Sequence, residues 1–216
     1  MKYQTILFDL DGTLTDPGEG ITRSVSYALK SFGIHVPDRK ELYPFIGPPL
    51  LDSFMEFYGF SEKEARQAVE KYREYFREQG IFENELYPGV PEALEKLKQA
   101  GSRLVLATSK PEPYAKIILE HFRLGGYFDF AFGSQLDGTR SKKGEVIAHA
   151  LRHCGKGPEE KALMVGDRKH DVQGALENGL LCAGVLYGYG SREELEQAGA
   201  RWILETPAEL SRLICL

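Results

Sequence analysis

The stretch Y-Q-T-I-L-F-D-L-D-G-T-L at residues 3–14 opens with an apolar run and closes on two carboxylates, Asp9 and Asp11, ahead of a glycine. The run predicts a buried strand, and Gly12 predicts a turn directly after it. Side chains alternate along a strand, so aspartates two positions apart point the same way. Two such carboxylates repel each other unless a cation shares their charge. The stretch therefore predicts a strand end that binds a divalent metal.

The Asp-Gly pair alone indicates no more than a turn, because it is one of the commonest turn dipeptides. The complete string D-L-D-G-T-L after a hydrophobic strand is far more specific. It resembles the first motif of the haloacid dehalogenase (HAD) superfamily of phosphatases. The resemblance implies that Asp9 is the nucleophile that attacks phosphorus. It also implies that Asp11 protonates the leaving oxygen and later activates water.

Length and charge fit a mid-sized enzyme. The chain has 216 residues, which exceeds the usual single-domain size of ~100–150 residues and leaves room for an inserted domain. A hydrophobic share of 42% is enough for a packed core. The formal net charge of -5, with both signs mixed along the chain, gives no basic face for nucleic acid. We therefore expect no nucleic-acid partner.

The three cysteines, Cys154, Cys182 and Cys215, are spaced as neither a C-x-x-C redox pair nor a zinc knuckle. We expect them to be reduced core residues of a cytoplasmic protein. No apolar stretch approaches the ~18 residues that a membrane span needs, and Asp9 comes too early for a signal peptide. We therefore expect a cytoplasmic location without membrane attachment.

Residues 16–86 predict an all-helical domain, because they show little of the β-branched alternation typical of a sheet. Three helices are expected: one over 20–32 ended by Gly33, one from Pro49 to Gly59, and one capped by Ser61 with Glu64 and ended by Gly80. In the second helix, Leu50, Phe54 and Phe57 form the expected buried stripe. We expect this domain to be a cap inserted into a core domain of residues 1–15 and 87–216.

From Tyr87 onward strands and helices alternate, which is the pattern of a parallel sheet covered by helices on both faces. Strands are expected over 103–109, 128–133, 162–167, 182–186 and 202–204. Helices are expected over 90–100, 113–122, 143–154 and 171–178, near Glu193 and at the C-terminus. The predicted fold class is therefore α/β, a Rossmann-like doubly wound parallel sheet with an inserted all-helical cap.

Ligands of open parallel sheets gather beyond the carboxyl ends of the strands. The run L-V-L-A ends in Thr108, Ser109 and Lys110, whose hydroxyls and backbone N–H groups suit a phosphate. Alone, the segment indicates a Ser/Thr turn before Pro111. Beside the first motif, it resembles the second HAD motif, in which the threonine hydroxyl binds the transferring phosphoryl group. The resemblance places Thr108 and Ser109 at the phosphate, although relatives often carry asparagine at the position of Ser109.

The run A-L-M-V ends in Gly166 and Asp167, and Asp171 follows four residues later. Both carboxylates lie near one site if a helix begins between them. The segment resembles the fourth motif of the family, G-D-x-x-x-D. There the first aspartate, here Asp167, is a metal ligand, and the second, here Asp171, supports the metal's waters or orients neighbours. The alternative for Asp171 is that it stabilises the helix N-terminus.

The family also supplies a lysine, at the start of a helix between these two motifs, to neutralise the phosphoryl group. The segment R-S-K-K-G-E-V-I offers two candidates. Lys143 immediately precedes Gly144 and the apolar stripe of the helix, so it matches best, and Lys142 is the reserve candidate. Without the other motifs, either lysine would be interpreted as a solvated charge.

The resemblance implies Mg²⁺ as the cofactor, bound by Asp9, by Asp167 and, through its backbone oxygen, by Asp11. Hard carboxylate oxygens suit this small dication. The implied activity is hydrolysis of small phosphorylated metabolites, phosphoglycolate-like or nucleoside 5'-monophosphate, through a phosphoaspartate on Asp9. The helical cap is expected to act as a lid. The segment F-I-G-P-P-L at 45–50 resembles the cap loop of phosphoglycolate phosphatase-like enzymes, and its alternative is an ordinary turn.

Two other functions stay open on the same fold. A sugar phosphomutase would hand the phosphoryl group from Asp9 to another substrate hydroxyl, and a silent binding protein would do no chemistry. The D-P-G-E and I-G-P-P segments look unlike the mutase lid. We expect a monomer or a weak homodimer. Tyr187 and Tyr189 are candidates to pack on a partner or to border the site, and solvated loop residues are the commoner alternative.

Overall fold

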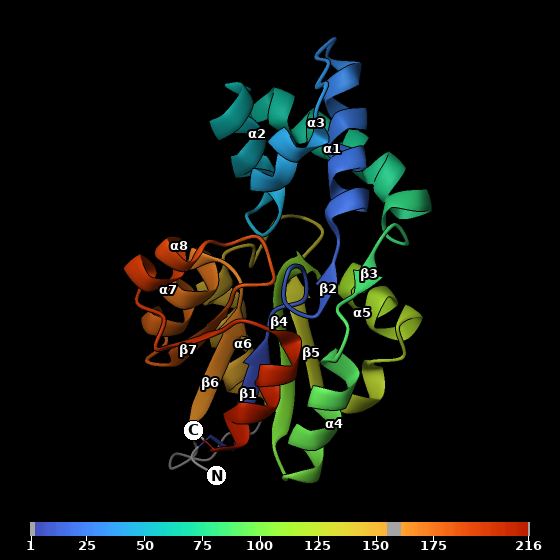
Figure 1. Cartoon of the computed structure of the whole chain (residues 1–216). Coiled ribbons are helices and arrows are strands. Elements are labelled where there is room, and N and C mark those ends of the chain that lie inside the picture. Colours follow the sequence, from blue (N-terminus) through green and yellow to red (C-terminus); the bar gives the residue numbers. More distant parts are fainter. Residues whose placement is uncertain (1–2, 155–160, 216) are drawn as a thin grey trace. The chain divides into compact units, whose positions relative to one another are not determined.

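The computed structural model describes residues 3–154 and 161–215. The chain forms two compact units, Met1–Thr15 with Leu86–Leu216, and Asp16–Glu85. The chain leaves the first unit at the short strand β2 (Thr15–Asp16) and returns at β3 (Glu85–Leu86), and these two strands pair with each other (Figure 1). The second unit is thus an insertion within the first.

The first unit is built on a six-stranded parallel sheet, as the alternating pattern predicts. Its strands are β1 (Thr5–Phe8), β4 (Arg103–Pro111), β5 (Phe130–Ser134), β6 (Ala162–Gly166), β7 (Leu181–Val185) and β8 (Trp202–Leu204). The strand order is β5-β4-β1-β6-β7-β8. The chain adds β4 and β5 on one side of β1, and then β6, β7 and β8 on the other. This reversal makes the carboxyl end of β1 the place where doubly wound sheets bind ligands.

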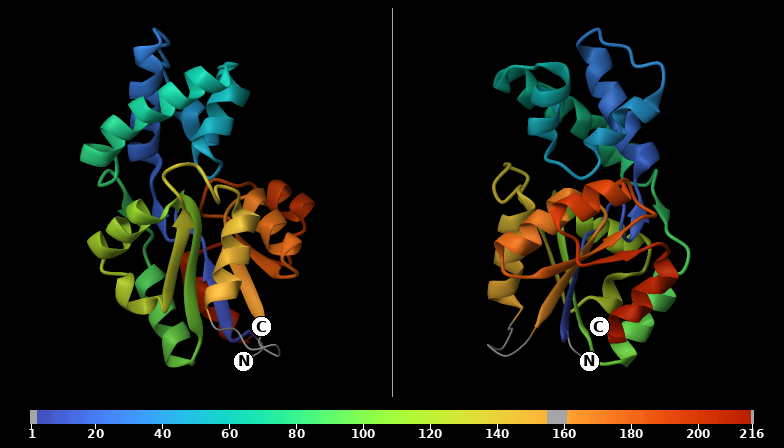
Figure 2. Two further views of the ribbon diagram at one scale, coloured as in Figure 1. Left: turned by 180° about the vertical axis from the view of Figure 1, so that it is seen from behind. Right: turned by 60° about the vertical axis from the view of Figure 1, so that its left-hand side comes forward.

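Helices cover both faces of this sheet (Figure 2). They are α4 (Val90–Gln99), α5 (Glu112–His121), α6 (Lys143–His153), α7 (Lys169–Glu177) and α8 (Arg192–Ala198), with the 3-10 helices η3 (Gly125–Tyr127) and η4 (Pro207–Cys215). In Figure 2, α6 and α7 lie over one face, and α4 and η4 lie over the other. The expected C-terminal helix is therefore a 3-10 helix. Its buried residues, Leu210 and Leu213, follow the three-residue period of that helix type.

One row of side chains in the sheet explains the direction of Asp9. Leu7, Val105, Met164 and Cys182 lie side by side in the parallel register, and they belong to the buried cluster that α6 and α7 complete. Because side chains alternate along a strand, Asp9 continues the row of Leu7 one step beyond the end of β1. The apolar core thus leads directly to Asp9 at the carboxyl edge of the sheet.

The second unit contains α1 (Gly18–Ser31), α2 (Leu50–Tyr58), α3 (Glu62–Tyr75), the 3-10 helix η1 (Arg39–Phe45) and the π-helical turn η2 (Phe76–Gly80). The three predicted helices are confirmed. Ser61 and Glu64 form the predicted capping box, in which the amide of Ser61 donates to the Glu64 carboxylate at 2.9 Å. Gly59 ends α2 in the left-handed conformation.

Two features of the helical unit differ from the sequence-based prediction. The sequence does not predict η1, whose buried residues Leu42 and Phe45 follow a three-residue period around Pro44. Phe57 is 42% exposed, so its assignment to the buried stripe of α2 is wrong. The ring of Phe45, from η1, packs against the buried Phe54, at 5.0 Å between ring centroids, and against Phe57, at 5.3 Å. Phe57 therefore contacts the buried Phe45 from the surface of the unit.

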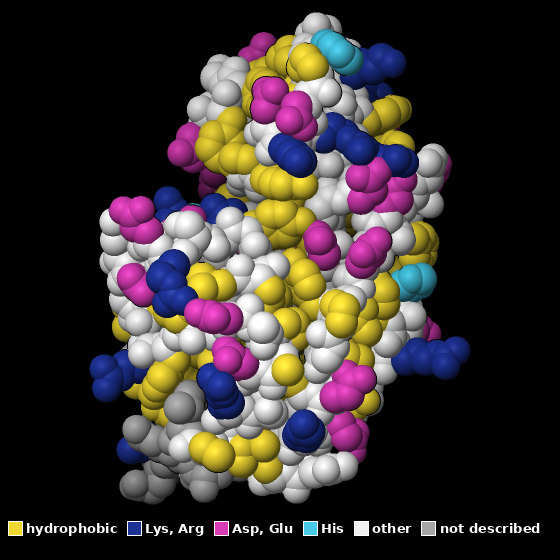
Figure 3. Space-filling view, viewed as in Figure 1, with side chains coloured by type: hydrophobic (Ala, Val, Ile, Leu, Met, Phe, Trp, Pro, Cys, Tyr) yellow, Lys and Arg dark blue, Asp and Glu magenta, His cyan; other side chains and the backbone are white. Residues whose placement is uncertain are grey.

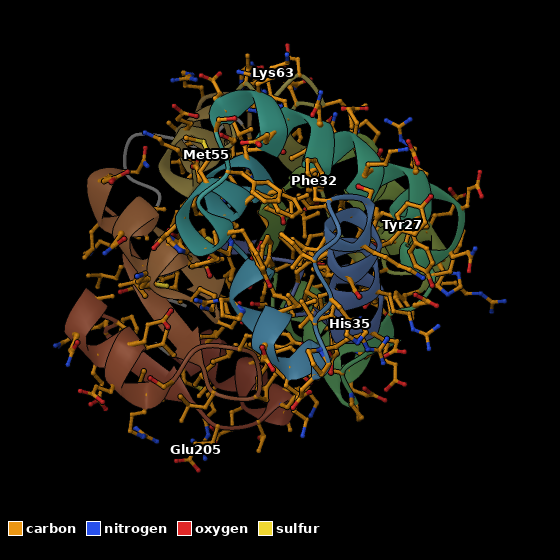
Figure 4. All side chains as sticks on the ribbon, turned by 90° about the horizontal axis from the view of Figure 1, so that it is seen from above. Tyr27, Phe32, His35, Met55, Lys63 and Glu205 are labelled. Atoms are coloured by element: carbon orange, nitrogen blue, oxygen red, sulfur yellow. The ribbon has the colours of Figure 1, made fainter. Side chains whose placement is uncertain are left out.

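Aromatic side chains form the inside of the helical unit. Phe32, labelled in Figure 4, lies between α1 and the other helices of this unit, with its ring centroid 4.8 Å from that of Phe60. The rings of the buried Tyr72 and Phe76 stack on each other, at 5.2 Å between centroids. The unit therefore has a hydrophobic core of its own.

The surface carries mixed charge. On the face shown in Figure 3, acidic and basic side chains are interspersed, and neither sign forms a continuous field. Among the described residues, no helix has both the length and the apolar character that crossing a membrane requires.

The cysteines differ in burial. Cys154 and Cys182 are buried, as predicted, whereas Cys215 is exposed. The prediction of a core position is therefore wrong for Cys215. The reason is the three-residue period of η4, which turns Leu210 and Leu213 inward and leaves Cys215 off that row.

Candidate active site

Asp9 and Asp11 follow β1 at the carboxyl edge of the sheet. The amide of Asp9 donates to the carbonyl of Val165 in β6 at 2.9 Å, so the backbone is still tied to the sheet at this residue. The amide of Leu14 then donates to the carbonyl of Leu10 at 2.8 Å, which folds the chain into a tight loop. The side chains of Asp9 and Asp11 are almost fully buried, at 4% and 7% exposed.

Gly12 brings this loop against the fourth motif. Its φ of 79° lies in the left-handed region that favours glycine. A β-carbon at this position would also overlap the carboxylate of Asp167. Both the turn and the close approach of Asp167 to the first loop therefore require glycine here.

Lys143 joins two of the carboxylates. It is the first residue of α6, and its ammonium nitrogen lies 2.6 Å from Asp9 Oδ1 and 2.8 Å from Asp171 Oδ1. The same nitrogen donates to the carbonyl of Ala107 at 3.1 Å. Lys142 is exposed. The structure thus brings Lys143, and not the reserve candidate Lys142, to the carboxylates.

Asp167 and Asp171 flank the start of α7, which begins between them as predicted. The amide of Tyr189 donates to Asp167 Oδ2 at 2.8 Å. Oδ1 of Asp167 is buried and has no hydrogen-bond partner among the residues that the structure describes. Asp171 accepts a hydrogen bond from the amide of Arg168 at 3.1 Å, so it also caps its helix.

Three carboxylates could hold a metal ion together. Asp9, Asp167 and Asp171 each offer one oxygen, and these oxygens lie within 4.8 Å of one another. A buried oxygen without a partner is costly, and a bound cation removes that cost at Asp167 Oδ1. The side chain of Asp11 is outside this group. Asp171 was expected to support the metal's waters, but its carboxylate lies close enough to those of Asp9 and Asp167 to be a metal ligand itself. The residues present fit a hard cation that prefers oxygen.

The pKa shifts at the site indicate a shortage of positive charge. Burial raises the pKa of Asp167 well above its usual range, and the carboxylates of Asp171 and Asp9 raise it further. Burial raises the pKa of Asp171 to about 6, against the opposing effect of Lys143. Burial alone would lower the pKa of Lys143, but Asp171 and Asp9 raise it above its usual value. Carboxyl groups that resist ionisation in this way are stabilised as carboxylates by a bound cation.

The second motif lies at the end of β4, which neighbours β1. Thr108 is buried, and its hydroxyl oxygen accepts a hydrogen bond from the amide of Lys110 at 3.2 Å. Ser109 is half-buried. The ammonium group of Lys110 lies 2.7 Å from Asp11 Oδ2. Burial raises the pKa of Asp11, although the charge of Lys110 lowers it.

The strand-end residues predicted from separate motifs therefore meet at one edge of the sheet, in the order typical of one enzyme family. The family model of haloacid dehalogenase-like hydrolases matches residues 6–185. The chain belongs to this family. The resemblance seen in the sequence is thereby confirmed, and the parallel sheet is its expected core.

Named relatives of this HAD-like hydrolase include phosphatases. Over 195 residues it is 53% identical to a 5'-nucleotidase of Pseudomonas aeruginosa, covering 90% of this chain and 88% of that protein. Over 194 residues it is 39% identical to the tyrosine-protein kinase PtkA of Mycobacterium tuberculosis, covering 90% of this chain and 66% of that protein. Phosphoglycolate phosphatases are among its more distant relatives.

A solved structure supports the same assignment. The crystal structure of a predicted phosphatase from Clostridium acetobutylicum matches this HAD-like hydrolase with a TM-score of 0.96 and 50% identity, over 100% of this chain and 99% of that one. Together with the family match and the 5'-nucleotidase relative, this makes the protein a phosphatase of the HAD family. Its substrates are phosphorylated small molecules.

The sequence did not predict that the loop after β7 supports the site of this HAD-like hydrolase. The hydroxyl of Tyr187 donates to the carbonyl of Thr13 at 3.0 Å, and its ring packs against Tyr87 at 5.0 Å between centroids. Tyr189 binds Asp167 through its amide. Tyr187 therefore borders the site, which was one of the alternatives for it, and Tyr189 is half-buried. The available signal was the G-Y-G run directly after a predicted parallel strand, at the ligand-binding edge of the sheet.

Proposed function

We propose that this phosphatase hydrolyses nucleoside 5'-monophosphates with Mg²⁺, through a phosphoaspartate on Asp9. The observation that carries the substrate class is the 53% identity to a 5'-nucleotidase over 90% of the chain. Phosphoglycolate is the second candidate, because more distant relatives carry that activity in their names and the segment 45–50 resembles their cap loop.

The charge of the site supports a divalent cation. Four buried carboxylates, Asp9, Asp11, Asp167 and Asp171, face two buried ammonium groups, Lys110 and Lys143. The carboxyl groups outnumber the ammonium groups by two, so the site has an excess of negative charge that one Mg²⁺ would offset, including when Asp11 is protonated. We propose that Asp9, Asp167 and Asp171 hold this ion, with the backbone oxygen of Asp11 as the further ligand implied by the family. Bound Mg²⁺ would supply positive charge that offsets the repulsion between the carboxylates and a substrate phosphate.

The side chains then divide the reaction between them. A carboxylate oxygen of Asp9 attacks phosphorus while the bond from phosphorus to the leaving oxygen breaks. Lys143 is already paired with Asp9 and supplies fixed positive charge beside the phosphoryl oxygens, and the hydroxyl of Thr108 donates to one of them. We propose the same donor role for Ser109. Positioned charge of this kind needs no rearrangement during the reaction.

Asp11 handles the protons of both half-reactions. It gives its proton to the leaving alkoxide as the phosphoaspartate forms. It then takes a proton from water, which attacks phosphorus and breaks the bond between phosphorus and Asp9. Asp9 and protonated Asp11 are regenerated, and inorganic phosphate leaves.

We propose that the helical unit, residues 16–86 with a core of 1–15 and 87–216, is the cap that selects the substrate. Its support is that the insertion follows the first motif directly and packs around buried aromatic side chains of its own. The measurement is the substrate ranking of variants in the segment 45–50. We expect the ranking to change while hydrolysis of a small aryl phosphate is retained, and an unchanged ranking would contradict the assignment.

The deciding experiment measures phosphate release from nucleoside 5'-monophosphates, phosphoglycolate, sugar phosphates and an aryl phosphate, with Mg²⁺ or EDTA. Asp9→Asn tests the nucleophile. Asp38→Asn is the matched control, because it makes the same change at an exposed cap of η1 where asparagine caps equally well. We expect release that needs Mg²⁺, is fastest with nucleotides and is lost only in Asp9→Asn. A phosphorylated isomer in place of phosphate would indicate a mutase, and no turnover of any kind would indicate a silent binding protein.

A further inference from the structure

A second buried ion pair lies beside the one between Lys143 and Asp9. The ammonium group of Lys110 lies 2.7 Å from Asp11 Oδ2, and the two side chains are only 5% and 10% exposed. Lys110 comes from β4 and Asp11 from the loop after β1, so the contact spans neighbouring strands of the sheet. An ion pair this short and this buried fixes the position of both groups.

The ion pair makes the two oxygens of Asp11 different. Oδ2 is held by Lys110. Oδ1 is buried and has no hydrogen-bond partner in the described part of the chain. A carboxylate without an ion-pair partner can rotate about its terminal bond, because the χ2 angle of aspartate has a broad distribution. Because Lys110 holds Oδ2 in place, Oδ1 is the oxygen that can contact a reacting group.

The two lysines of the site serve different aspartates. Lys143 contacts Asp9, Asp171 and the carbonyl of Ala107. Lys110 contacts Asp11, and its backbone amide binds the hydroxyl oxygen of Thr108. One lysine is therefore placed at the attacking carboxylate and the other at the carboxylate assigned to proton transfer.

We propose that Lys110 is a positioning residue for proton transfer. It holds Oδ2 of Asp11, so that Oδ1 protonates the leaving oxygen and then accepts the proton of the attacking water. This inference rests on the proposed role of Asp11 in the phosphatase reaction. Lys110 itself neither gives nor takes a proton and touches no reacting atom.

The experiment uses substrates that differ in their need for a proton. From a nucleoside 5'-monophosphate, the nucleoside leaves as an alkoxide and needs a proton from Asp11. From para-nitrophenyl phosphate, the leaving group is a stable phenolate that needs no proton. The quantity compared is kcat/KM, because it reports the steps up to departure of the leaving group and excludes hydrolysis of the phosphoaspartate. The variants are Lys110→Met, Lys110→Gln and, as the reference for lost proton transfer, Asp11→Asn. Lys116→Met is the matched control, since Lys116 is an exposed lysine on α5.

We expect Lys110→Met to lower kcat/KM for the nucleotide by about 10²-fold or more, and for the aryl phosphate by less than about tenfold. Asp11→Asn should show the same selectivity. Lys110→Gln should recover part of the nucleotide activity, because its amide can still donate a hydrogen bond to Oδ2. Lys116→Met should match the wild type with both substrates.

Two results would overturn the proposal. Equal losses with both substrates would make Lys110 a structural residue, and thermal denaturation of each variant identifies losses caused by unfolding. A loss found only in KM for the nucleotide, with kcat retained, would make Lys110 a substrate-binding cation. Failure of the phosphatase assignment is distinguishable, because in that case wild type and Asp9→Asn would not differ with either substrate.

Discussion

The ammonium nitrogen of Lys143 lies 2.6 Å from Asp9 Oδ1, and both side chains are about 5% exposed. This contact joins the N-terminus of α6 to the carboxyl end of β1, two elements far apart in the sequence. It places a fixed positive charge directly beside the oxygen atoms of the proposed nucleophile.

Replacing Lys143 should abolish most of the activity. Lys143→Met removes the positive charge next to the phosphoryl group, and we expect kcat/KM for an aryl phosphate to fall by about 10²-fold or more. Steady-state kinetics beside Lys142→Met checks this, because Lys142 is exposed and adjacent in the sequence. Lys142→Met should behave as the wild type. Comparable losses in both variants would contradict the placement of Lys143.

Without Mg²⁺, the protein should lose stability as the pH rises through the range of its perturbed carboxyl groups. Burial raises the pKa of Asp11 and Asp167, and it raises that of Asp171 from 3.8 to about 6. The folded state therefore binds more protons than the unfolded state between roughly pH 4 and 6, and the free energy of unfolding falls as these protons leave. Burial lowers the pKa of His149 and His170, which acts in the opposite direction.

Comparing thermal denaturation with and without Mg²⁺ separates the effect of the carboxyl groups on stability from that of the histidines. We expect the stabilisation by Mg²⁺ to be larger at pH 7.5 than at pH 5, by an amount on the order of 1–3 kcal/mol. The reason is that Mg²⁺ binds carboxylates and competes with protons for them. A stabilisation that is the same at both pH values would show that these carboxyl groups do not bind the ion.

Adding one methyl group at Gly188 should weaken metal binding. A β-carbon there would overlap the carbonyl of Gly12 and the side chain of Asp167, and so push Asp167 out of place. For Gly188→Ala we expect Mg²⁺ affinity, measured by calorimetry, to fall by about 10–100-fold. The control is Gly126→Ala, because Gly126 is exposed and has open space at its β-position. Wild-type affinity in Gly188→Ala would show that the loop after β7 does not hold Asp167 in position.

Only one of the three thiols should react with a thiol reagent in the folded protein. Cys215 is exposed, whereas Cys154 and Cys182 are buried, and burial raises the pKa of the Cys182 thiol well above its usual value. Counting modified cysteines before and after unfolding, with mapping of the labelled peptide, checks this. We expect label on Cys215 alone in the folded state and on all three after unfolding. Fast labelling of Cys182 in the folded protein would contradict the described core.

Much of the fold followed from local patterns in the sequence. The apolar run before Asp9 predicted β1, and the alternation after Tyr87 predicted the parallel sheet around it. The Ser61 and Glu64 capping box marked the start of α3, because capping depends only on residues within one helical turn. The exposure of Phe57 was not predictable from its own helix, because its ring contacts Phe45, which comes from the separate segment η1. A contact between two segments cannot be predicted from the pattern of either segment alone.

The candidate site was predicted only in part, because local patterns show where strands end but not which side chains meet across segments. Asp9, Thr108 and Asp167 each end a predicted strand, so the sequence alone placed them at one edge of the sheet. The partner of Lys110 could not be predicted, because its contact with Asp11 depends on β4 lying next to β1 and on the direction of a long side chain. The contact of the Tyr189 amide with Asp167 belongs to a backbone group, which leaves no trace in residue identity.

Trapping the phosphorylated residue tests the proposed role of Asp9 most directly. A single turnover with a labelled nucleoside 5'-monophosphate and Mg²⁺ is stopped in acid, and the label is located by peptide mass spectrometry. We expect transient label on Asp9 that is absent in Asp9→Asn. In Asp11→Asn with an aryl phosphate the label should persist longer, because hydrolysis of the phosphoaspartate then lacks its base. Rapid release of phosphate without any labelled residue, or label on another side chain, would contradict the assignment of Asp9 as the nucleophile.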